Sequence, residues 1–217
     1  MHAGFQKYLW ENGVGDDWLK RNKSTLGSRD LIGNVLNKIT GYTPKSVLEI
    51  GCSNGWRLKK LKEKYGCSIA GIDPSLEAVN DAAESGIHVD LGTADSLPYK
   101  DQQFDMVIFG FCLCFISPED WFNVVRESDR VLKNGGLLLI YDFIGTKFFK
   151  RRMMQITLNN ALEEKPLYLY NFNWPTLWLA HPSYTEAVYL CDNNKAEFCV
   201  ALHKDLDSLL NDNIEVA

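Results

Sequence analysis

The chain has 217 residues, of which 46% are hydrophobic and 24% charged, a composition typical of a folded globular domain. With 16 Gly, 7 Pro, no low-complexity tract and no run of about 18 apolar residues, the disordered, collagen-like and membrane-spanning classes are set aside. The net charge is −5, with 12 basic and 6 acidic side chains in residues 1–70 and 11 and 22 in the remainder. This balance does not favour wholesale nucleic-acid binding.

The first residues and the cysteines bear on location and metal content. No basic segment leads into an apolar stretch at the start, so we expect a cytoplasmic protein. The six cysteines form no CxxC pair and have no His at zinc spacing, so we expect buried small apolar residues and neither a metal nor a disulfide framework. They are Cys52, Cys67, Cys112, Cys114, Cys191 and Cys199.

From residue 47 onward, short apolar runs alternate with amphipathic stretches, which is the pattern of strands and crossover helices in a parallel sheet. Helices are predicted at 55–65, after Ser75 and after Ser117. Strands are predicted at 47–50, 68–72, 88–91, 104–111 and 136–143, then at 186–191 and 196–203. The last two are joined by an Asp-Asn-Asn-Lys turn typical of a hairpin. We expect one α/β domain over residues 1–217, with a doubly wound, mostly parallel seven-stranded sheet that ends in an antiparallel hairpin.

Two segments fall outside this regular pattern. Residues 1–40 are expected to be helical and to form a lid, and residues 145–184 to form an aromatic-rich insert on the substrate side. In the insert, Tyr168, Tyr170, Phe172 and Trp174 alternate with other residues and would share one face of an extended segment. These rings either face a substrate or pack onto the core.

The sharpest local signal is the strand, glycine turn and helix start over residues 47–56. A glycine such as Gly51 lets the backbone approach a ligand closely, at the place where a doubly wound sheet opens into a crevice. Asp73 follows Gly51 by 22 residues, at the end of the second predicted strand. A carboxylate there can accept hydrogen bonds from both hydroxyls of a ribose. The two features together indicate an adenosine-containing ligand.

The spacing of the glycines narrows the choice of ligand. A dinucleotide fingerprint requires Gly-x-Gly-x-x-Gly, but Ser53 and Trp56 stand at its second and third glycine positions. Side chains at these positions would obstruct a pyrophosphate, which weakens a dehydrogenase interpretation. Glu49 is expected to face a cationic ligand group, because its carboxylate would repel phosphates and attract an ammonium or a sulfonium.

From about residue 45 to the C-terminus, these residues resemble the class I S-adenosylmethionine-dependent methyltransferases. The family's Glu/Asp-x-Gly-x-Gly-x-Gly motif matches residues 49–55, with Ser53 in place of the middle glycine. Its ribose-binding acid matches Asp73, and its third motif matches residues 94–98, followed by the Phe-Asp-Met-Val run at 104–107. The resemblance implies S-adenosylmethionine as cofactor. It also implies that Asp95 accepts from the exocyclic amine of adenine, with Ser96 and Pro74 nearby.

The residues expected to bind the cofactor come from these motifs and from the N-terminal segment. Residues 10–22 resemble the leader of bacterial methyltransferases of surface-sugar biosynthesis. That resemblance implies a helix over the cofactor, where the guanidinium of Arg21 would pair with the cofactor carboxylate; otherwise Arg21 is a solvated helix residue. The full expected set is Arg21, Glu49, Gly51, Cys52, Gly55, Asp73, Pro74, Ala94, Asp95, Ser96 and Gly110.

Methyl transfer from a sulfonium needs in-line alignment of the acceptor and exclusion of water more than covalent help. An alcohol or acid acceptor would also profit from a general base. Three residues are candidates: Asp142, at the end of the fifth predicted strand, and His181 and Tyr184, in the insert. A structural role is the alternative for each.

The acceptor class is expected to be a small molecule or a glycan precursor. After the fourth predicted strand there is no Asn/Asp-Pro-Pro-aromatic signature and no Pro-Cys pair, so DNA is not an expected substrate. A basic cluster, Lys147, Lys150, Arg151 and Arg152, would either hold a phosphate of a nucleotide-linked sugar or form a solvated helix face. Two alternatives stay open: an NAD-binding oxidoreductase, and a non-catalytic member of the fold that binds the cofactor or a partner.

Overall fold

The computed structural model describes residues 5–28, 30–143, 149–157, 164–192 and 197–205, with residues 5, 149–157, 164–171 and 192 as backbone only. Seven strands form one sheet in the order β3-β2-β1-β4-β5-β9-β8. β1 to β5 are parallel, whereas β9 is antiparallel to both β5 and β8. The strands are β1 Ser46–Ile50, β2 Ser68–Asp73, β3 Asp90–Leu91, β4 Phe104–Gly110, β5 Leu132–Phe143, β8 Tyr184–Asp192 and β9 Glu197–Lys204. The doubly wound sheet with a C-terminal antiparallel hairpin is confirmed.

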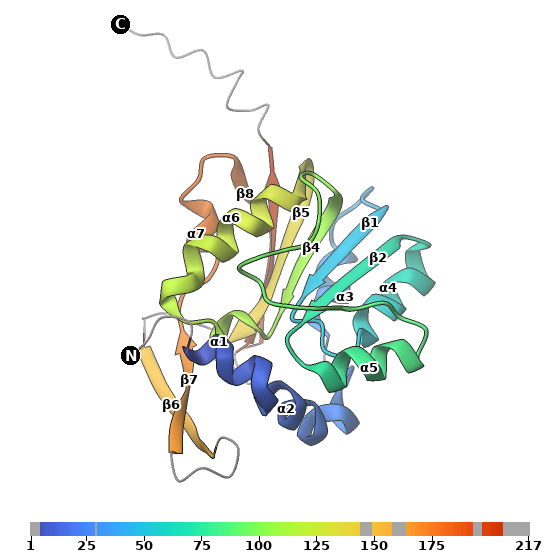
Figure 1. The fold of residues 1–217 in the computed structure, drawn as a ribbon. Coiled ribbons are helices and arrows are strands. Elements are labelled where there is room, and N and C mark those ends of the chain that lie inside the picture. The colour runs from blue at the N-terminus through green and yellow to red at the C-terminus, as the bar shows by residue number, and fades with distance from the viewer. Residues whose placement is uncertain (1–4, 29, 144–148, 158–163, 193–196, 206–217) are drawn as a thin grey trace, which may run out of the picture.

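Helices cover both faces of the sheet (Figure 1). Met106 and Ile108 of β4 pack with α3 (Leu31–Leu36) and α4 (Trp56–Tyr65) in one apolar core. Val107 and Phe109 pack with α6 (Trp121–Val131) in the other. Successive side chains of a strand point to opposite faces, so a strand buried on both sides reads as an unbroken apolar run.

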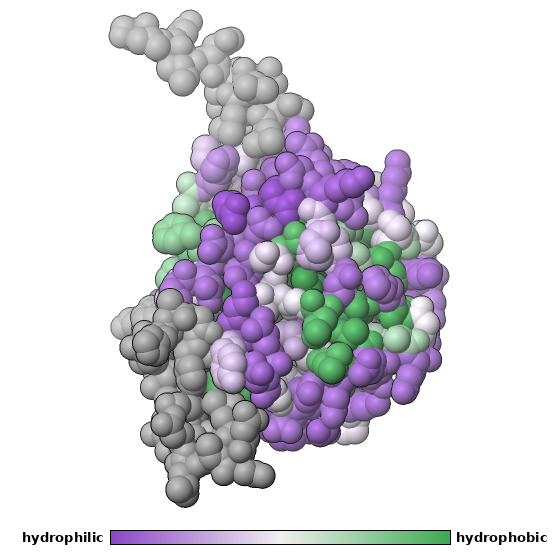
Figure 2. Space-filling model, viewed as in Figure 1, coloured by the Kyte–Doolittle hydropathy of each residue, from purple (hydrophilic) through white to green (hydrophobic). Residues whose placement is uncertain are grey.

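No helix connects β3 to β4, which are joined by an irregular segment at residues 92–103. Figure 2 shows hydrophobic surface gathered over the region of β2 and α5 (Leu76–Glu84). Leu76 and Leu91 contribute to the apolar surface there, since more than half of each is exposed.

The N-terminal segment consists of α1 (Phe5–Leu9), the π-helix η1 (Trp10–Val14), α2 (Gly15–Asn22) and the short 3₁₀ helix η2 (Lys23–Thr25). A kink lies inside η1, where Gly13 has φ +112°. α2 docks on the start of α5, because Asp16 Oδ1 accepts hydrogen bonds from Ser75 Oγ at 2.6 Å and from Glu77 N at 3.1 Å. These two hydrogen bonds therefore fix α2 to α5. The kink at Gly13 separates α2 from α1.

The segment expected to form an aromatic insert contains a separate antiparallel pair, β6 (Phe149–Thr157) with β7 (Glu164–Asn171), and then α7 (Thr176–Leu179). The pair projects beside α1 (Figure 1). The Phe172 and Trp174 rings both contact Trp121 of α6, at centroid distances of 5.2 and 5.1 Å, so these two pack onto the body of the domain. The Tyr168 and Tyr170 side chains and the basic cluster at residues 147–152 lie outside the described side chains. Among the described residues, no helix has the length and apolar character needed to cross a membrane.

Candidate functional site

A cleft of about 900 Å³, its open mouth included, lies at the carboxyl ends of β1, β2 and β4. This is the edge at which open α/β sheets bind ligands. Three groups of residues line it: turns after the strands, the N-terminal helices, and the segment between β4 and α6. They are Lys7, Trp10, Gly15, Trp18, Ile50, Gly51, Ser53, Ile72, Asp73, Pro74, Ala78, Gly92, Thr93, Ala94, Asp95, Gly110, Phe111, Cys112, Phe115, Ile116, Ser117, Asp120 and Val124.

The turn after β1 is built so that backbone, and not side chain, faces the cleft. Gly51 has φ +69°, and a Cβ there would lie 2.6 Å from Cys112 Cβ. Ser53 also adopts a left-handed conformation, with φ +52°, although it has a side chain. Its amide donates to Asp73 Oδ2 at 2.7 Å, and its buried Oγ has no hydrogen-bond partner among the described residues. A non-glycine residue held in this conformation beside a cleft is a feature of functional sites.

Asp73 connects the turn after β1 to the start of α5 after β2. Its Oδ2 accepts from the Ser53 amide, and its Oδ1 accepts from the Ser75 amide at 2.9 Å. Burial raises the pKa of Asp73 to about 6, and the two amide hydrogen bonds oppose that rise. A carboxylate has about four acceptor positions, so two positions stay available for the hydroxyls of a ligand.

Asp95 is held by the N-terminal helix. Lys7 Nζ of α1 lies 3.0 Å from Asp95 Oδ1 and 2.8 Å from Oδ2. Burial acts to raise the pKa of Asp95, but hydrogen bonds from Lys7 and Thr93 and the charge of Lys7 hold it below its ordinary value. Asp95 is therefore ionised at neutral pH, and it connects α1 to the cleft.

The N-terminal helices supply one wall of the cleft. Lys7, Trp10, Gly15 and Trp18 line it, and the Trp10 ring lies 4.8 Å from that of Phe115. Gln6 Nε2 donates to the Phe115 carbonyl and adds a second anchor for α1. Sequence reasoning did not select Lys7, Trp10 or Trp18, because helical periodicity does not reveal which surface a helix covers. The leader motif at residues 10–22 was the available signal.

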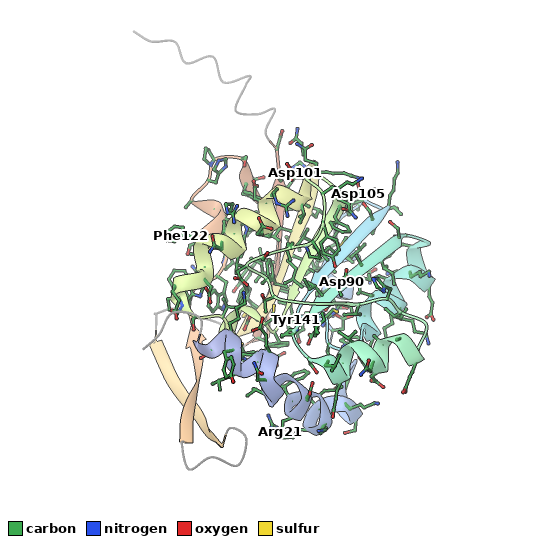
Figure 3. All side chains as sticks on the ribbon, viewed as in Figure 1. Arg21, Asp90, Asp101, Asp105, Phe122 and Tyr141 are labelled. Atoms are coloured by element: carbon green, nitrogen blue, oxygen red, sulfur yellow. The ribbon has the colours of Figure 1, made fainter. Side chains whose placement is uncertain are left out.

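The residues expected to bind the cofactor divide into two groups. Six line the cleft: Gly51, Asp73, Pro74, Ala94, Asp95 and Gly110. Five do not, namely Arg21, Glu49, Cys52, Gly55 and Ser96. Arg21 is exposed at the outer side of α2 (Figure 3). This is the position of a solvated helix residue, the alternative given for Arg21 above.

Glu49 points away from the cleft, which corrects the expectation that it faces a cationic ligand group. The side chain lies on the face of β1 that α4 covers, where the Arg57 guanidinium donates to Glu49 Oε1. Arg57 also pairs with Asp30 through Nε, at 3.3 Å. Burial raises the pKa of Glu49 to about 7, and the nearby guanidinium opposes that rise. A Cβ at Gly110 would lie 2.6 Å from Arg57 Nη1, so Arg57 sits directly beneath the floor of the cleft.

Asp142 lies at the carboxyl end of β5, as expected, but the structure does not expose it to the cleft. It is 0% exposed, and its oxygens accept from the Phe143 amide at 2.8 Å and the Cys114 amide at 3.3 Å. Burial raises the pKa of Asp142 to about 7. Its contacts hold the 3₁₀ turn η3 (Leu113–Phe115) in place, so a role in proton removal from a bound acceptor has no support in this geometry.

His181 and Tyr184 lie at the opposite edge of the sheet, which corrects their assignment as candidate bases. Tyr184, the first residue of β8, pairs with Lys204 of β9. His203, which precedes Lys204, pairs with Leu137 in the amino-terminal half of β5. The Tyr184 hydroxyl donates to Asp129 Oδ1 at 2.9 Å, and His181 Nδ1 lies 2.6 Å from Ser183 Oγ. Neither residue lines the cleft. Because β9 is antiparallel to both β5 and β8, β8 runs in the same direction as β5. Its first residue therefore lies at the amino edge of the sheet, far from the ligand edge.

The described residues contain no group of three or more His, Cys, Asp or Glu side chains placed to hold a metal. All six cysteines are free thiols. Cys191 is exposed, and Cys112 is half-buried in the cleft wall, where its thiol donates to the Ile50 carbonyl at 3.2 Å. The expectation that every cysteine is buried is therefore wrong for these two.

A glycine turn after β1, a carboxylate after β2 and this strand order together define the class I S-adenosylmethionine-dependent methyltransferase fold. A family described as "Methyltransferase domain" matches residues 48–140. An uncharacterized protein of Haemophilus influenzae is 35% identical over 106 residues, 45% of this chain and 42% of that protein. Norajmaline N-methyltransferase of Rauvolfia serpentina is 32% identical over 108 residues, 46% of this chain and 36% of that protein. The chain therefore has the class I S-adenosylmethionine-dependent methyltransferase fold, and its central residues 48–140 match the methyltransferase-domain family.

One solved structure extends the likeness across nearly the whole chain. The 1,6-didemethyltoxoflavin-N1-methyltransferase of Burkholderia thailandensis, with bound 1,6-didemethyltoxoflavin and S-adenosylhomocysteine, matches with a TM-score of 0.66 at 13% identity. The match covers 94% of this chain and 92% of that chain. At this identity the likeness concerns the fold alone. The chain spans about two fifths of the length of the first two curated relatives.

Proposed function

We propose that the protein transfers a methyl group from S-adenosylmethionine to a small molecule or a glycan precursor. The charge of the cleft carries the proposal. Among the described lining residues, Asp73, Asp95 and Asp120 supply three carboxylates and Lys7 the only ammonium. S-adenosylmethionine, with a sulfonium, an ammonium and one carboxylate, is a net cation that this surface attracts. The pyrophosphate of NAD would be repelled.

The residues present fit this cofactor. Asp73 has acceptor positions left for the two ribose hydroxyls, and the Gly51 turn offers backbone without a side chain. The buried Ser53 Oγ has no partner in the described part of the chain, and it adds a hydroxyl at the same turn. Asp95, Ala94 and Pro74 would surround the adenine. When bound, the sulfonium supplies an electrophilic methyl group, and the protein's own residues hold the acceptor in line with it.

The N-terminal helices serve as a lid in this proposal. Lys7, Trp10 and Trp18 cover the cleft, and apolar side chains over a reacting centre exclude water. Asp16 fixes α2 on α5, while the kink at Gly13 separates α2 from α1. We assign the movable part of the lid to α1. We assign the substrate side to residues 145–184, in which the β6–β7 pair lies beside α1 (Figure 1).

Calorimetry with S-adenosylhomocysteine tests cofactor binding. Asp73→Asn removes the charge on the carboxylate that would receive the ribose hydroxyls, and we expect the dissociation constant to rise by roughly 10- to 100-fold, or about 1.5–3 kcal/mol. Asp101→Asn is the matched control, because Asp101 is a largely exposed aspartate outside the cleft. Equal affinity of the wild type and the Asp73 variant would contradict the assignment.

Two further measurements separate the alternatives. Thermal-shift experiments with S-adenosylmethionine and NAD compare the two cofactors directly, since a ligand at 100 times its dissociation constant stabilises a protein by about 2.7 kcal/mol. Stabilisation by NAD alone would favour an oxidoreductase. Incubation with labelled methyl donor and fractionated lysate then tests turnover: a labelled product supports the proposal, and tight cofactor binding without any labelled product favours a non-catalytic protein.

A further inference from the structure

The charge and the aromatic character of the same cleft also restrict the acceptor. We infer that the acceptor is a flat molecule, uncharged or cationic, and that Asp120 selects against acceptors carrying a phosphate or a carboxylate. This inference rests on the methyl transfer proposed above and narrows its acceptor class.

The balance of charges in the cleft is the first argument. Lys7 is the one cation among the described lining residues, and its ammonium is already within 3.0 Å of both oxygens of Asp95. Because Asp73 and Asp95 are assigned to the cofactor, an anionic acceptor would meet the carboxylate of Asp120 without a free side-chain cation among the described lining residues. Arginine and lysine are the side chains that most often hold a phosphate in proteins, and Lys7 is the only one of these in the described lining.

Asp120 is the second argument. It ends the short 3₁₀ helix η4 (Pro118–Asp120), directly before α6, and its half-buried carboxylate lines the cleft. It does not cap α6, and in the described part of the chain no side chain or amide donates to it. Burial, with the nearby charges of Asp95 and Glu119, raises the pKa of Asp120. A carboxylate in such surroundings gains most from an incoming cation or N–H donor.

The aromatic side chains are the third argument. Trp10 and Trp18 come from the lid and Phe115 from the segment after β4, so aromatic residues line the cleft from two sides. Phe111 also lines the cleft, but its ring packs on Tyr141 at a centroid distance of 4.3 Å. Aromatic faces bind flat apolar groups and cations well. A phosphate is neither apolar nor cationic, so aromatic faces do not favour it.

The test compares two probes that share a ring system and differ in charge. Wild-type protein saturated with S-adenosylhomocysteine is titrated calorimetrically with tryptamine, a cation, and with indole-3-acetate, an anion. We expect tryptamine to bind about ten-fold more tightly, which corresponds to about 1.4 kcal/mol. Uridine diphosphate glucose is the third probe, because the basic residues at 147–152 would hold it if they faced the cleft, and we expect it to bind more weakly than tryptamine.

Variants assign the selectivity to Asp120. Asp120→Asn should reduce the ratio of the two affinities to less than about three-fold, and Glu119→Gln, which alters the exposed neighbour, should leave the ratio unchanged. The inference is overturned if neither indole probe binds, if indole-3-acetate or uridine diphosphate glucose binds as tightly as tryptamine, or if Asp120→Asn keeps the wild-type ratio. Failure of the wild type to bind S-adenosylhomocysteine would instead overturn the proposed function, so the two failures are distinguishable.

Discussion

Arg57 offers the sharpest test of how the floor of the cleft is held. Arg57 is 4% exposed, and its guanidinium pairs with Glu49, which is 1% exposed, and with Asp30 at 3.3 Å. Arg57→Met keeps much of the volume of the side chain and removes its charge. Glu49 then has no cation beside it in an apolar environment, and its Oε2 already has no hydrogen-bond partner among the described groups.

The expected loss of stability depends on pH because Glu49 titrates near neutrality. Removing one partner of a buried ion pair costs about 3–5 kcal/mol when the other partner stays charged. Burial raises the pKa of Glu49 from its ordinary 4.5 to about 7 in the folded protein. A group whose folded pKa is raised contributes stability that is fully present below pH 4.5 and is lost as the pH rises through 7. Without Arg57 this pKa rises further, so the variant loses more stability at pH 8 than at pH 5.

Urea unfolding at both pH values measures this difference. We expect Arg57→Met to lose about 3–5 kcal/mol at pH 8, and about 1–3 kcal/mol at pH 5, where a protonated Glu49 needs only a hydrogen-bond partner. Lys59→Met, on the exposed side of the same helix, should change stability by less than about 0.5 kcal/mol at either pH. An equal loss at pH 5 and pH 8 would refute the idea that an uncompensated Glu49 charge causes the destabilisation.

Three other substitutions test the turn, the lid and the far edge of the sheet. Gly51→Val should abolish cofactor binding and lower the melting temperature, because its Cβ would lie 2.6 Å from Cys112 Cβ; a stable variant that binds S-adenosylhomocysteine normally would argue against the turn. Lys7→Met should speed S-adenosylhomocysteine release about two- to five-fold in stopped-flow fluorescence, since a half-exposed ion pair contributes up to about 1 kcal/mol; an unchanged rate would exclude the Lys7 anchor. Tyr184→Phe should cost about 1 kcal/mol of stability and leave turnover unchanged, whereas a large fall in turnover would restore Tyr184 as a catalytic residue.

The sheet was predictable because its signals are local. Residues 47–50 and 104–110 are mostly apolar and mostly buried, and Gly55 and the capping Ser75 mark where α4 and α5 begin. The glycine turn and Asp73 were predictable for the same reason: each follows directly from the end of a strand, and parallel strands bring these ends to one edge. Within the site, the prediction succeeded for Gly51 and Asp73 because the end of a single strand determines the position of each.

The predictions failed where position depends on packing between distant segments. Glu49 has the motif position expected of a ligand-facing acid, but strand alternation turns it toward α4, where Arg57 meets it. Tyr184 and His181 follow an aromatic segment, yet the direction in which β8 joins β9 decides which edge of the sheet they reach. The sequence contains no signal for which face of the sheet α4 covers, nor for the direction in which β8 joins β9, and these two features decide the outcomes.

The contact between Lys7 and Asp95 has a thermodynamic consequence for the lid. The carboxylate assigned to the adenine amine is also the one that anchors α1, with both oxygens engaged by the ammonium. A carboxylate has acceptor positions for both groups, so an amine donor can join the contact without displacing the lysine. If Lys7 and the adenine amine bind Asp95 together, each of them orders the carboxylate for the other. Closure of α1 and cofactor binding then reinforce one another. If the amine displaces Lys7, binding opens α1 instead. The sign of the effect of Lys7→Met on cofactor affinity therefore decides between a lid that closes on the cofactor and one that the cofactor releases.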